Sequence, residues 1–335
     1  MEHSLARSGR AMNQPPANQT SVLSVSPPTT AMANNRSSLR TFLNLIKFSH
    51  SIFAMPFALV AMFLAAQQTG EGLPNVTQWA LIIGCMVSAR TFAMTFNRMA
   101  DRKFDAGNPR TRNRPSVTGA LSVRWMATAL VVSAAVFVAL TLAFWGMFHN
   151  PWPAILAVPV LGFIAFYSYT KRFTWLCHFV IGASLGLAPL SAWVALVPPH
   201  GPMMSAQIIW LALAVMLWTA GFDLLYAMQD IEIDRRERLY SLPARFGPRV
   251  GLAVSRLCHG STLLALAAFG MAWGGGVTLG VVYWVGWIAV AILLAIEQSL
   301  VKPDDISRIN LAFMTINGIV GLVFGALSIA AILLV

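Results

Sequence analysis

The chain has 335 residues, of which 57% are hydrophobic and only 10% are charged, and its formal net charge is +11. Soluble globular domains carry about 25% charged residues, so this composition, with a mean hydropathy of +0.67, excludes that class and predicts a polytopic membrane protein. The basic excess does not predict nucleic-acid binding, because it follows the connections between apolar segments described below.

Residues 1–38 are rich in Ser, Asn, Pro and Thr and contain no continuous apolar run. This composition predicts a disordered cytoplasmic tail and argues against a secretory signal peptide. Several arginines with a single acid leave a transit peptide open as an alternative. We expect residues 39–335 to form one membrane domain.

Nine segments after this tail are apolar enough to cross a membrane. A spanning helix needs about 20 apolar residues to cross a hydrocarbon core about 30 Å thick. The nine segments are centred near Phe57, Val87, Ala134, Leu161, Leu187, Leu213, Ala265, Ile288 and Val320. They predict an all-α membrane bundle of about nine spanning helices.

Lys and Arg occur in the N-terminal tail and in or beside every second connection between these segments. The other connections, around Gly70, His149, His200 and Gly275, contain none. The positive-inside rule therefore places the N-terminus and the basic connections in the cytoplasm, and nine crossings place Val335 outside. We expect a multi-pass protein of the cell inner membrane.

Two acidic segments lie at cytoplasmic ends of spanning segments. The first contains Asn97, Asp101 and Asp105, and the second contains Asp223, Asp230 and Asp234. Spacings of four and seven residues keep side chains on one face of a helix, because four residues advance the direction by only about 40°. Both segments therefore predict a row of oxygen-bearing side chains, although solvated helix ends with ordinary surface pairs are the structural alternative.

Carboxylates that face one another raise each other's pKa and tend to become neutral unless a cation lies between them. The two acidic segments supply oxygen ligands without His or Cys, which favours Mg²⁺ completed by water and substrate phosphates. We therefore expect all six residues to contribute to a magnesium site.

Basic residues follow the acids. Arg110 and Arg114 come directly after the first acidic segment, and Tyr167 and Lys171 are spaced by four at another cytoplasmic helix end. Guanidinium and ammonium groups bind phosphate oxygens, and a tyrosine hydroxyl on the same face can donate to them. The alternative for Lys171 is a topology anchor at the membrane surface.

Arg90 lies about two turns before Asn97, inside a spanning segment, where a charge requires a partner. We expect it to hold the carboxylate of a second substrate or to pair with an aspartate. Lys47 and His50 open the first spanning segment and are candidates for the mouth of the same cavity, with simple snorkelling to the surface as the alternative.

Acids, bases and lipid-embedded walls together predict a site for a diphosphate whose hydrocarbon tail stays in the bilayer. Mg²⁺ and cationic side chains stabilise a departing diphosphate, and an apolar, aromatic wall tolerates an allylic cation. The predicted chemistry is electrophilic alkylation of an acceptor, with Lys171 and the five aspartates as the catalytic groups.

The combined motifs resemble the UbiA superfamily of intramembrane aromatic prenyltransferases. They are Asn97-x3-Asp101-x3-Asp105 with Arg110-Thr111-x-x-Arg114-Pro115, Tyr167-x3-Lys171, and Asp223-x6-Asp230-x3-Asp234. The resemblance covers residues 43–335 and implies nine helices around a central cavity that opens sideways to lipid. It also implies that the two aspartate motifs bind Mg²⁺ and a polyprenyl diphosphate.

Within the superfamily the chain is most similar to bacterial 4-hydroxybenzoate polyprenyltransferases, which implies 4-hydroxybenzoate as acceptor. Residues 47–50 (KFSH) and 116–117 (SV) depart from the Lys-Pro and Pro-Leu that many ubiquinone-pathway members carry. These departures leave open a carboxylated dihydroxynaphthalene of menaquinone synthesis as the alternative acceptor. The alternative outside enzymes is a cation-coupled transporter, and no protein partner is predicted.

Overall fold

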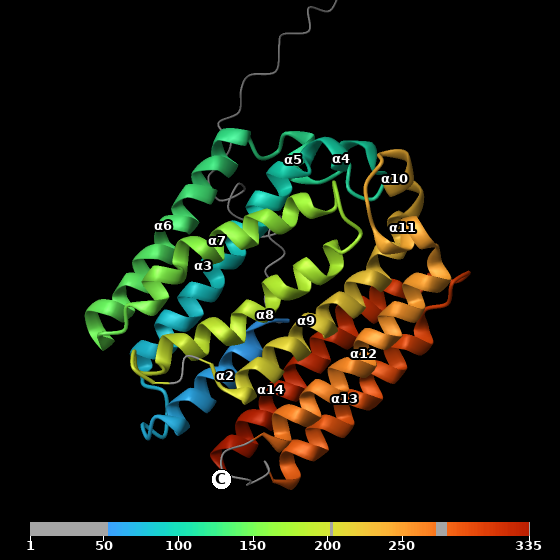
Figure 1. Cartoon of the computed structure of the whole chain (residues 1–335). Coiled ribbons are helices and arrows are strands. Elements are labelled where there is room, and N and C mark those ends of the chain that lie inside the picture. Colours follow the sequence, from blue (N-terminus) through green and yellow to red (C-terminus); the bar gives the residue numbers. More distant parts are fainter. Residues whose placement is uncertain (1–52, 202–203, 273–279, 335) are drawn as a thin grey trace, which may run out of the picture.

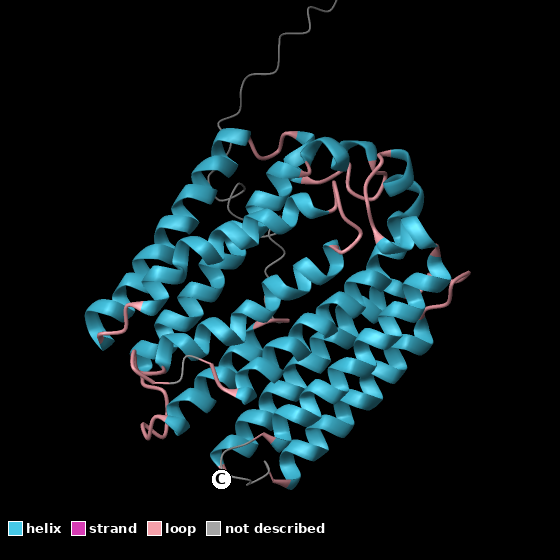
Figure 2. Cartoon of the chain, in the orientation of Figure 1, coloured by secondary structure: helices cyan, strands magenta, loops and turns pink. Residues whose placement is uncertain are grey.

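The computed structural model describes residues 53–201, 204–272 and 280–334, and within these ranges the chain forms helices joined by loops, without strands (Figure 2). The long helices are α2 (Met55–Gln68), α3 (Val76–Ala100), α6 (Val123–Phe148), α7 (Trp152–Thr170), α8 (Cys177–Leu196), α9 (Ala206–Ala227), α12 (Pro248–Met271), α13 (Val281–Leu300) and α14 (Asn317–Leu333). The short elements are α4 (Arg102–Gly107), α5 (Pro115–Thr118), η2 (Met228–Asp230), α10 (Ile231–Arg236), α11 (Leu242–Phe246) and the π-helical η4 (Leu311–Ile316).

Eight segments among the described residues are long and apolar enough to cross a membrane, and α2 is a shorter apolar helix of 14 residues. Each of the nine predicted centres falls inside one of these helices. The chain is a multi-pass membrane protein, and the predicted all-α bundle of about nine helices is confirmed. The expected tail, Lys47 and His50 lie outside the described residues.

Helix α9 is the central element of the bundle. It packs against α8 on one side and α12 on the other, and 67% of its most apolar window is buried, against 22% for α6. The outer helices α6 and α13 instead expose apolar side chains such as Val131 and Ile292, as expected where lipid replaces water. Figure 1 shows α8, α9 and α12 running alongside one another through the bundle.

The contact between α8 and α9 depends on two glycines. A Cβ atom added at Gly186 would lie 2.9 Å from the carbonyl oxygen of Ala212, and one added at Gly182 would collide with the carbonyl oxygen of Met216. Small residues four apart allow membrane helices to approach closely. The two glycines therefore set the distance between α9 and α8.

A buried polar cluster joins α9, α13 and α14. The Asn317 side chain donates to Glu297 Oε1 at 2.6 Å and accepts from the Trp218 indole at 2.7 Å. It also donates to the carbonyl oxygen of Ala312 in η4 at 3.2 Å. Since polar groups surrounded by apolar side chains require partners, these bonds fix how the three helices pack.

The short helices α4, α5, α10 and α11 gather at one end of the bundle (Figure 1). They come from the two polar regions of the sequence that contain the acidic segments, residues 101–122 and 228–247. The fold therefore brings two regions more than 100 residues apart to the same end of the molecule.

Candidate active site

The first acidic segment crosses from α3 into α4. Asp101 lies between the two helices, and backbone hydrogen bonds from Asp101 to Asn97 (2.9 Å) and from Asp105 to Asp101 (2.8 Å) continue the helical pattern across this junction. The Asn97 side chain donates to Asp101 Oδ2 at 2.8 Å. The spacing predicted one helical face, and the structure keeps that face despite a change of element at Asp101.

The second acidic segment occupies three successive elements. Asp223 lies in α9, Asp230 is the last residue of η2, and Asp234 lies in α10. The tighter 3₁₀ turn of η2 changes the helical phase between Asp223 and Asp230. All three side chains nevertheless face the same space.

That space is a polar cavity of about 230 Å³ at the end of the bundle. Five aspartates and five basic side chains line it: Asp101, Asp105, Asp223, Asp230, Asp234, Arg98, Arg110, Arg114, Lys171 and Arg172. The formal charges of these ten groups cancel. The cavity is therefore rich in ionised groups without being strongly acidic or basic as a whole.

An ion pair joins the loop after the first acidic segment to the second acidic segment. The Arg110 guanidinium donates to both oxygens of Asp230, at 2.6 and 3.2 Å, and the Asn108 amide donates to the same carboxylate at 3.0 Å. Arg110 also donates to the Tyr226 hydroxyl at 2.7 Å. A bidentate Arg–carboxylate pair fixes orientation as well as distance, so the loop after the first segment is held on the second.

The other carboxylates of the cavity have cationic or imidazole partners. The pairs are Arg114–Asp105 at 2.7 Å, Lys171–Asp234 at 2.7 Å, Arg172–Asp101 at 3.3 Å and His178–Asp223 at 2.7 Å. The Arg172–Asp101 and His178–Asp223 pairs join residues that are 71 and 45 positions apart in the sequence. The acids are therefore not free solvated helix ends.

Burial and pairing oppose each other at Lys171 and Asp101. Burial alone lowers the pKa of Lys171, but the Asp234 carboxylate beside it outweighs burial and the pKa is raised above its ordinary value. Burial raises the pKa of Asp101, and the hydrogen bond from Arg172 offsets only part of that rise. Lys171 consequently keeps its charge at neutral pH.

The oxygen atoms of the polar cavity are candidate ligands for a metal ion. Across the described residues, no three Asp, Glu, His or Cys side chains converge into a group that would hold a metal by itself. The acids instead lie on different walls of one cavity and offer oxygen atoms only. Mg²⁺ typically binds through one or two carboxylates together with waters and substrate phosphates. This donor set therefore fits an open Mg²⁺ site that a substrate completes, and does not fit a site closed by protein ligands alone.

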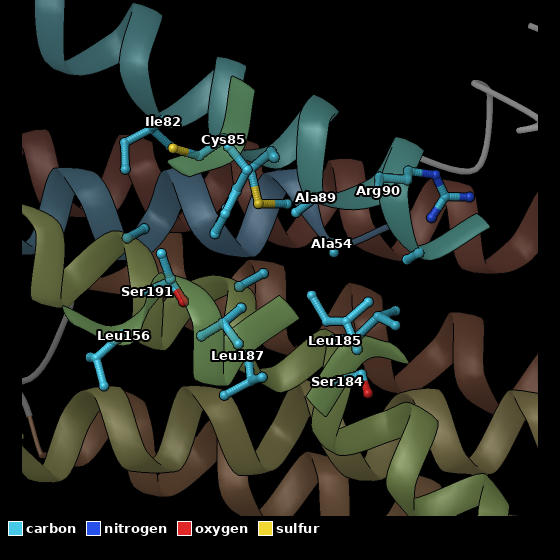
Figure 3. Close-up of a pocket in the computed structure, with 18 of the residues that line it drawn as sticks. Ala54, Ile82, Cys85, Ala89, Arg90, Leu156, Ser184, Leu185, Leu187 and Ser191 are labelled. Atoms are coloured by element: carbon cyan, nitrogen blue, oxygen red, sulfur yellow. The ribbon is translucent and has the colours of Figure 1, made fainter. Parts of the chain in front are cut away.

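A second, apolar cavity of about 200 Å³ lies among α3, α6, α7 and α8. Arg90 lies on its wall, and Figure 3 shows Cys85, Ala89 and Arg90 along one side with Leu185 and Leu187 opposite. The Arg90 Nε atom is buried and has no hydrogen-bond partner in the described chain. A buried guanidinium donor without a partner indicates a place for an anionic or polar ligand group.

The structure separates Tyr167 from Lys171, which the sequence placed on one face. Tyr167 lines the apolar cavity together with Arg90, whereas Lys171 lines the polar cavity. Lys171 is the C-cap residue of α7, one position beyond the last helical residue. The two residues therefore face different cavities.

Four residues that belong to the site were not predicted from the sequence. Asn108 and Arg172 contact the acids directly, Arg98 lines the polar cavity, and His178 contacts Asp223. Arg98 and Arg172 are adjacent to motif residues and look like topology anchors in the sequence. His178 lies 45 residues from its partner and carries no local signal.

Comparison with known proteins gives a consistent result. The model of the UbiA prenyltransferase family matches residues 54–319. A 4-hydroxybenzoate octaprenyltransferase from Aromatoleum aromaticum is 30% identical over 304 residues, which is 89% of this chain and 97% of that protein. Another from Alkalilimnicola ehrlichii is 29% identical over 255 residues, covering 76% and 82%.

Solved structures agree in fold. The apo structure of a UbiA homolog from Aeropyrum pernix K1 has a TM-score of 0.73 and 28% identity, covering 84% of this chain and 97% of that one. A UbiA homolog from Archaeoglobus fulgidus, bound to GPP and Mg²⁺, has a TM-score of 0.62 at 20% identity, covering 87% and 99%. At that identity the second likeness concerns the fold alone.

Proposed function

The chain belongs to the UbiA prenyltransferase family and is a membrane prenyltransferase, and on that premise we propose that it transfers a polyprenyl group from a polyprenyl diphosphate to 4-hydroxybenzoate. The observation that carries the proposal is the pairing of the two acidic segments around one polar cavity, beside an apolar cavity that contains a buried arginine. The first cavity suits a diphosphate, and the second suits an aromatic acid and hydrocarbon.

We assign the polar cavity to the diphosphate and to Mg²⁺, which is bound in the Archaeoglobus fulgidus neighbour. The residues that would hold the metal are Asn97, Asp101, Asp105, Asp223, Asp230 and Asp234. When bound, Mg²⁺ neutralises diphosphate charge and stabilises it as a leaving group. Lys171, Arg110 and Arg114 then bind phosphate oxygens, because a ligand that occupies their carboxylate partners leaves these cations available.

Arg90 is assigned to the carboxylate of the aromatic acid. Its Nε donor is buried and unpartnered, and its neighbours in the cavity are mainly apolar. A carboxylate held there places the phenol ring against the apolar wall that Tyr167 shares. Water is scarce in such a space, which protects an allylic cation from hydrolysis.

In the proposed reaction the allylic carbon–oxygen bond of the diphosphate breaks, and the ring carbon ortho to the phenol hydroxyl forms a carbon–carbon bond. The ring then loses one proton, either to a carboxylate of the polar cavity or to the released diphosphate, which restores its aromaticity. The chain's part is to bind the leaving group, orient the ring and exclude water. No redox change takes place.

We place the polar cavity on the cytoplasmic side of the cell inner membrane, since the basic connections gather at that end. Both substrates carry a water-soluble charged group, and this orientation gives those groups access from the cytoplasm. The prenyl tail stays in lipid.

An acceptor screen tests this proposal. Purified full-length protein in nanodiscs would receive geranyl diphosphate or a long polyprenyl diphosphate, Mg²⁺ and one acceptor. The acceptors are 4-hydroxybenzoate, a carboxylated dihydroxynaphthalene, and 4-hydroxybenzyl alcohol, which lacks the carboxylate. We expect prenylated 4-hydroxybenzoate and at most a trace of the alcohol product. Prenylation of the naphthalene alone would reassign the acceptor, and no product from either acid would contradict the proposal.

A further inference from the structure

A three-residue segment after α10, Tyr240–Leu242, touches several groups of the polar cavity. The Tyr240 amide donates to the carbonyl oxygen of Lys171 at 2.6 Å, and the Ser241 hydroxyl donates to Asp234 Oδ2 at 2.7 Å. The Leu242 amide donates to His178 Nε2 at 3.3 Å. Ser241 and Leu242 are both buried, so water does not compete strongly for these bonds.

The contact with Leu242 determines what His178 can do on its other side. The hydrogen bond from the Leu242 amide requires a lone pair on Nε2, which assigns the imidazole hydrogen to Nδ1. Nδ1 lies 2.7 Å from Asp223 Oδ2 and therefore donates to it. The imidazole is almost completely buried in the first turn of α8, so its orientation is fixed by packing as well.

Asp223 has a different environment from that of its partner. Its side chain is 26% exposed and lines the polar cavity, whereas the His178 side chain is 3% exposed and lies behind it. A carboxylate on a helix rotates about its side-chain bonds unless something holds one oxygen. The hydrogen bond from His178 holds Oδ2 and fixes how the carboxylate faces the cavity.

We infer that His178 is a positioning residue that orients the Asp223 carboxylate, with its own tautomer set by the backbone amide of Leu242. This inference rests on the proposed function, in which Asp223 helps to hold Mg²⁺ with the diphosphate. Partners of ligating carboxylates typically alter metal affinity by about 10–100-fold when they are removed. His178 acts through Asp223 and does not itself touch substrate.

Three substitutions separate positioning from packing. In His178→Asn the amide nitrogen takes the place of Nδ1 and still donates to Asp223, but nothing accepts the Leu242 amide proton. In His178→Gln the longer amide reaches the place of Nε2 and accepts from Leu242, but the donor to Asp223 is lost. His178→Phe loses both hydrogen bonds while filling the space.

The readout is binding of Mn²⁺, as a spectroscopic substitute for Mg²⁺, measured by electron paramagnetic resonance in nanodiscs containing full-length protein and geranyl diphosphate without acceptor. We expect His178→Gln and His178→Phe to weaken Mn²⁺ binding about 10–100-fold and His178→Asn to stay within about threefold of wild type. Thermal unfolding of each variant identifies any that does not fold. If His178→Phe does not fold, the comparison of His178→Asn with His178→Gln still tests the inference.

Binding to the wild-type protein distinguishes failure of the positioning role of His178 from failure of the proposed function. If it binds Mn²⁺ in a diphosphate-dependent way but all three variants bind equally well, the positioning inference is overturned and the proposed function stands. The positioning inference is also overturned if His178→Asn and His178→Gln weaken Mn²⁺ binding to the same extent, since a change in packing alone would then explain the effect. If the wild type shows no diphosphate-dependent Mn²⁺ binding, the proposed function is wrong, and the inference that rests on it is wrong as well.

Discussion

Each aspartate of the polar cavity is paired in the structure, and the pairs explain why so many charges are tolerated at a membrane helix end. Removing one member of a partly buried pair leaves the other charge uncompensated and is destabilising, whereas exchanging one partner for another keeps the charge compensated. A ligand that brings both a cation and phosphates permits such an exchange. On the proposed function, this exchange is how the paired carboxylates and cations would accept a metal–diphosphate.

Arg90 offers a test at the scale of one side chain. If it binds the acceptor carboxylate, Arg90→Gln should raise KM for 4-hydroxybenzoate about 10–100-fold, because a charge-assisted hydrogen bond contributes about 1.5–3 kcal/mol. KM for the polyprenyl diphosphate should change less than about threefold. Steady-state kinetics with each substrate varied in turn measure both values.

The control for Arg90 is Arg112→Gln, which alters an exposed arginine outside the polar cavity. The assignment of Arg90 to the acceptor carboxylate is wrong if Arg90→Gln and Arg112→Gln change KM for the acid equally, or if Arg90→Gln raises only KM for the diphosphate.

Spacing predicted the acids because it is a local property, and the structure places all five aspartates on one cavity. Partner choice is not local. Asn108 and Asp230 lie 122 residues apart, and His178 and Asp223 lie 45 apart, so only the packing of helices brings them together. In the sequence alone, His178 lies within an apolar segment and is indistinguishable from a packing residue, because its partner Asp223 is not apparent.

At the scale of elements, the spacing between α8 and α9 controls how His178 meets Asp223. Gly182→Ala would push a methyl group into the carbonyl oxygen of Met216, and only helix movement relieves that contact. We expect a lower unfolding temperature and at least about tenfold lower turnover, since small shifts of a positioned group are costly. Fluorescence-detected thermal unfolding and product formation measure the two effects.

Gly162→Ala in α7 is the matched control, because a Cβ atom there meets nothing within 4 Å. It should match or slightly exceed wild type in stability, since alanine favours helix over glycine by about 1 kcal/mol. The account of the α8–α9 contact is wrong if the two alanine variants behave alike.

The Asn317 cluster predicts a second effect on packing. Asn317→Ala removes the partners of Glu297 and Trp218 at the junction of α9, α13 and α14. We expect a loss of about 2–3 kcal/mol in the free energy of unfolding, because two interhelical hydrogen bonds are lost and the buried Glu297 Oε1 loses its donor. Asn310→Ala, at an exposed residue, should be close to neutral, and similar losses in both variants would contradict the assignment.

Helix positions were predictable because apolar windows are long and continuous, and each predicted centre lies in a helix. The ends were not. The break at Asp101, the 3₁₀ turn at Met228–Asp230 and the π-helical turn at Leu311–Ile316 reflect contacts made after the helices pack. Side-chain bonds such as that from Asn317 to Ala312 are invisible to hydropathy.

At the scale of the whole molecule, the positive-inside rule predicts which end of the bundle faces the cytoplasm. A cysteine at exposed Arg112 should resist a membrane-impermeant maleimide in intact cells, whereas one at exposed His200 should react. The native Cys85, Cys177 and Cys258 are partly or fully buried and give low background. Both engineered cysteines should react after permeabilisation, and the reverse labelling pattern in intact cells would invert the orientation.

The central claim is that two acidic segments, distant in sequence, form one metal-dependent prenyl-transfer site. The most direct measurement is formation of prenylated 4-hydroxybenzoate in nanodiscs across a Mg²⁺ titration, for wild type, Asp230→Asn and the exposed-loop control Asp304→Asn. We predict product from wild type and the control that disappears on chelation, and a loss of at least about 100-fold in Asp230→Asn at the same Mg²⁺ concentration. Undiminished product after chelation, or from Asp230→Asn, would contradict the account.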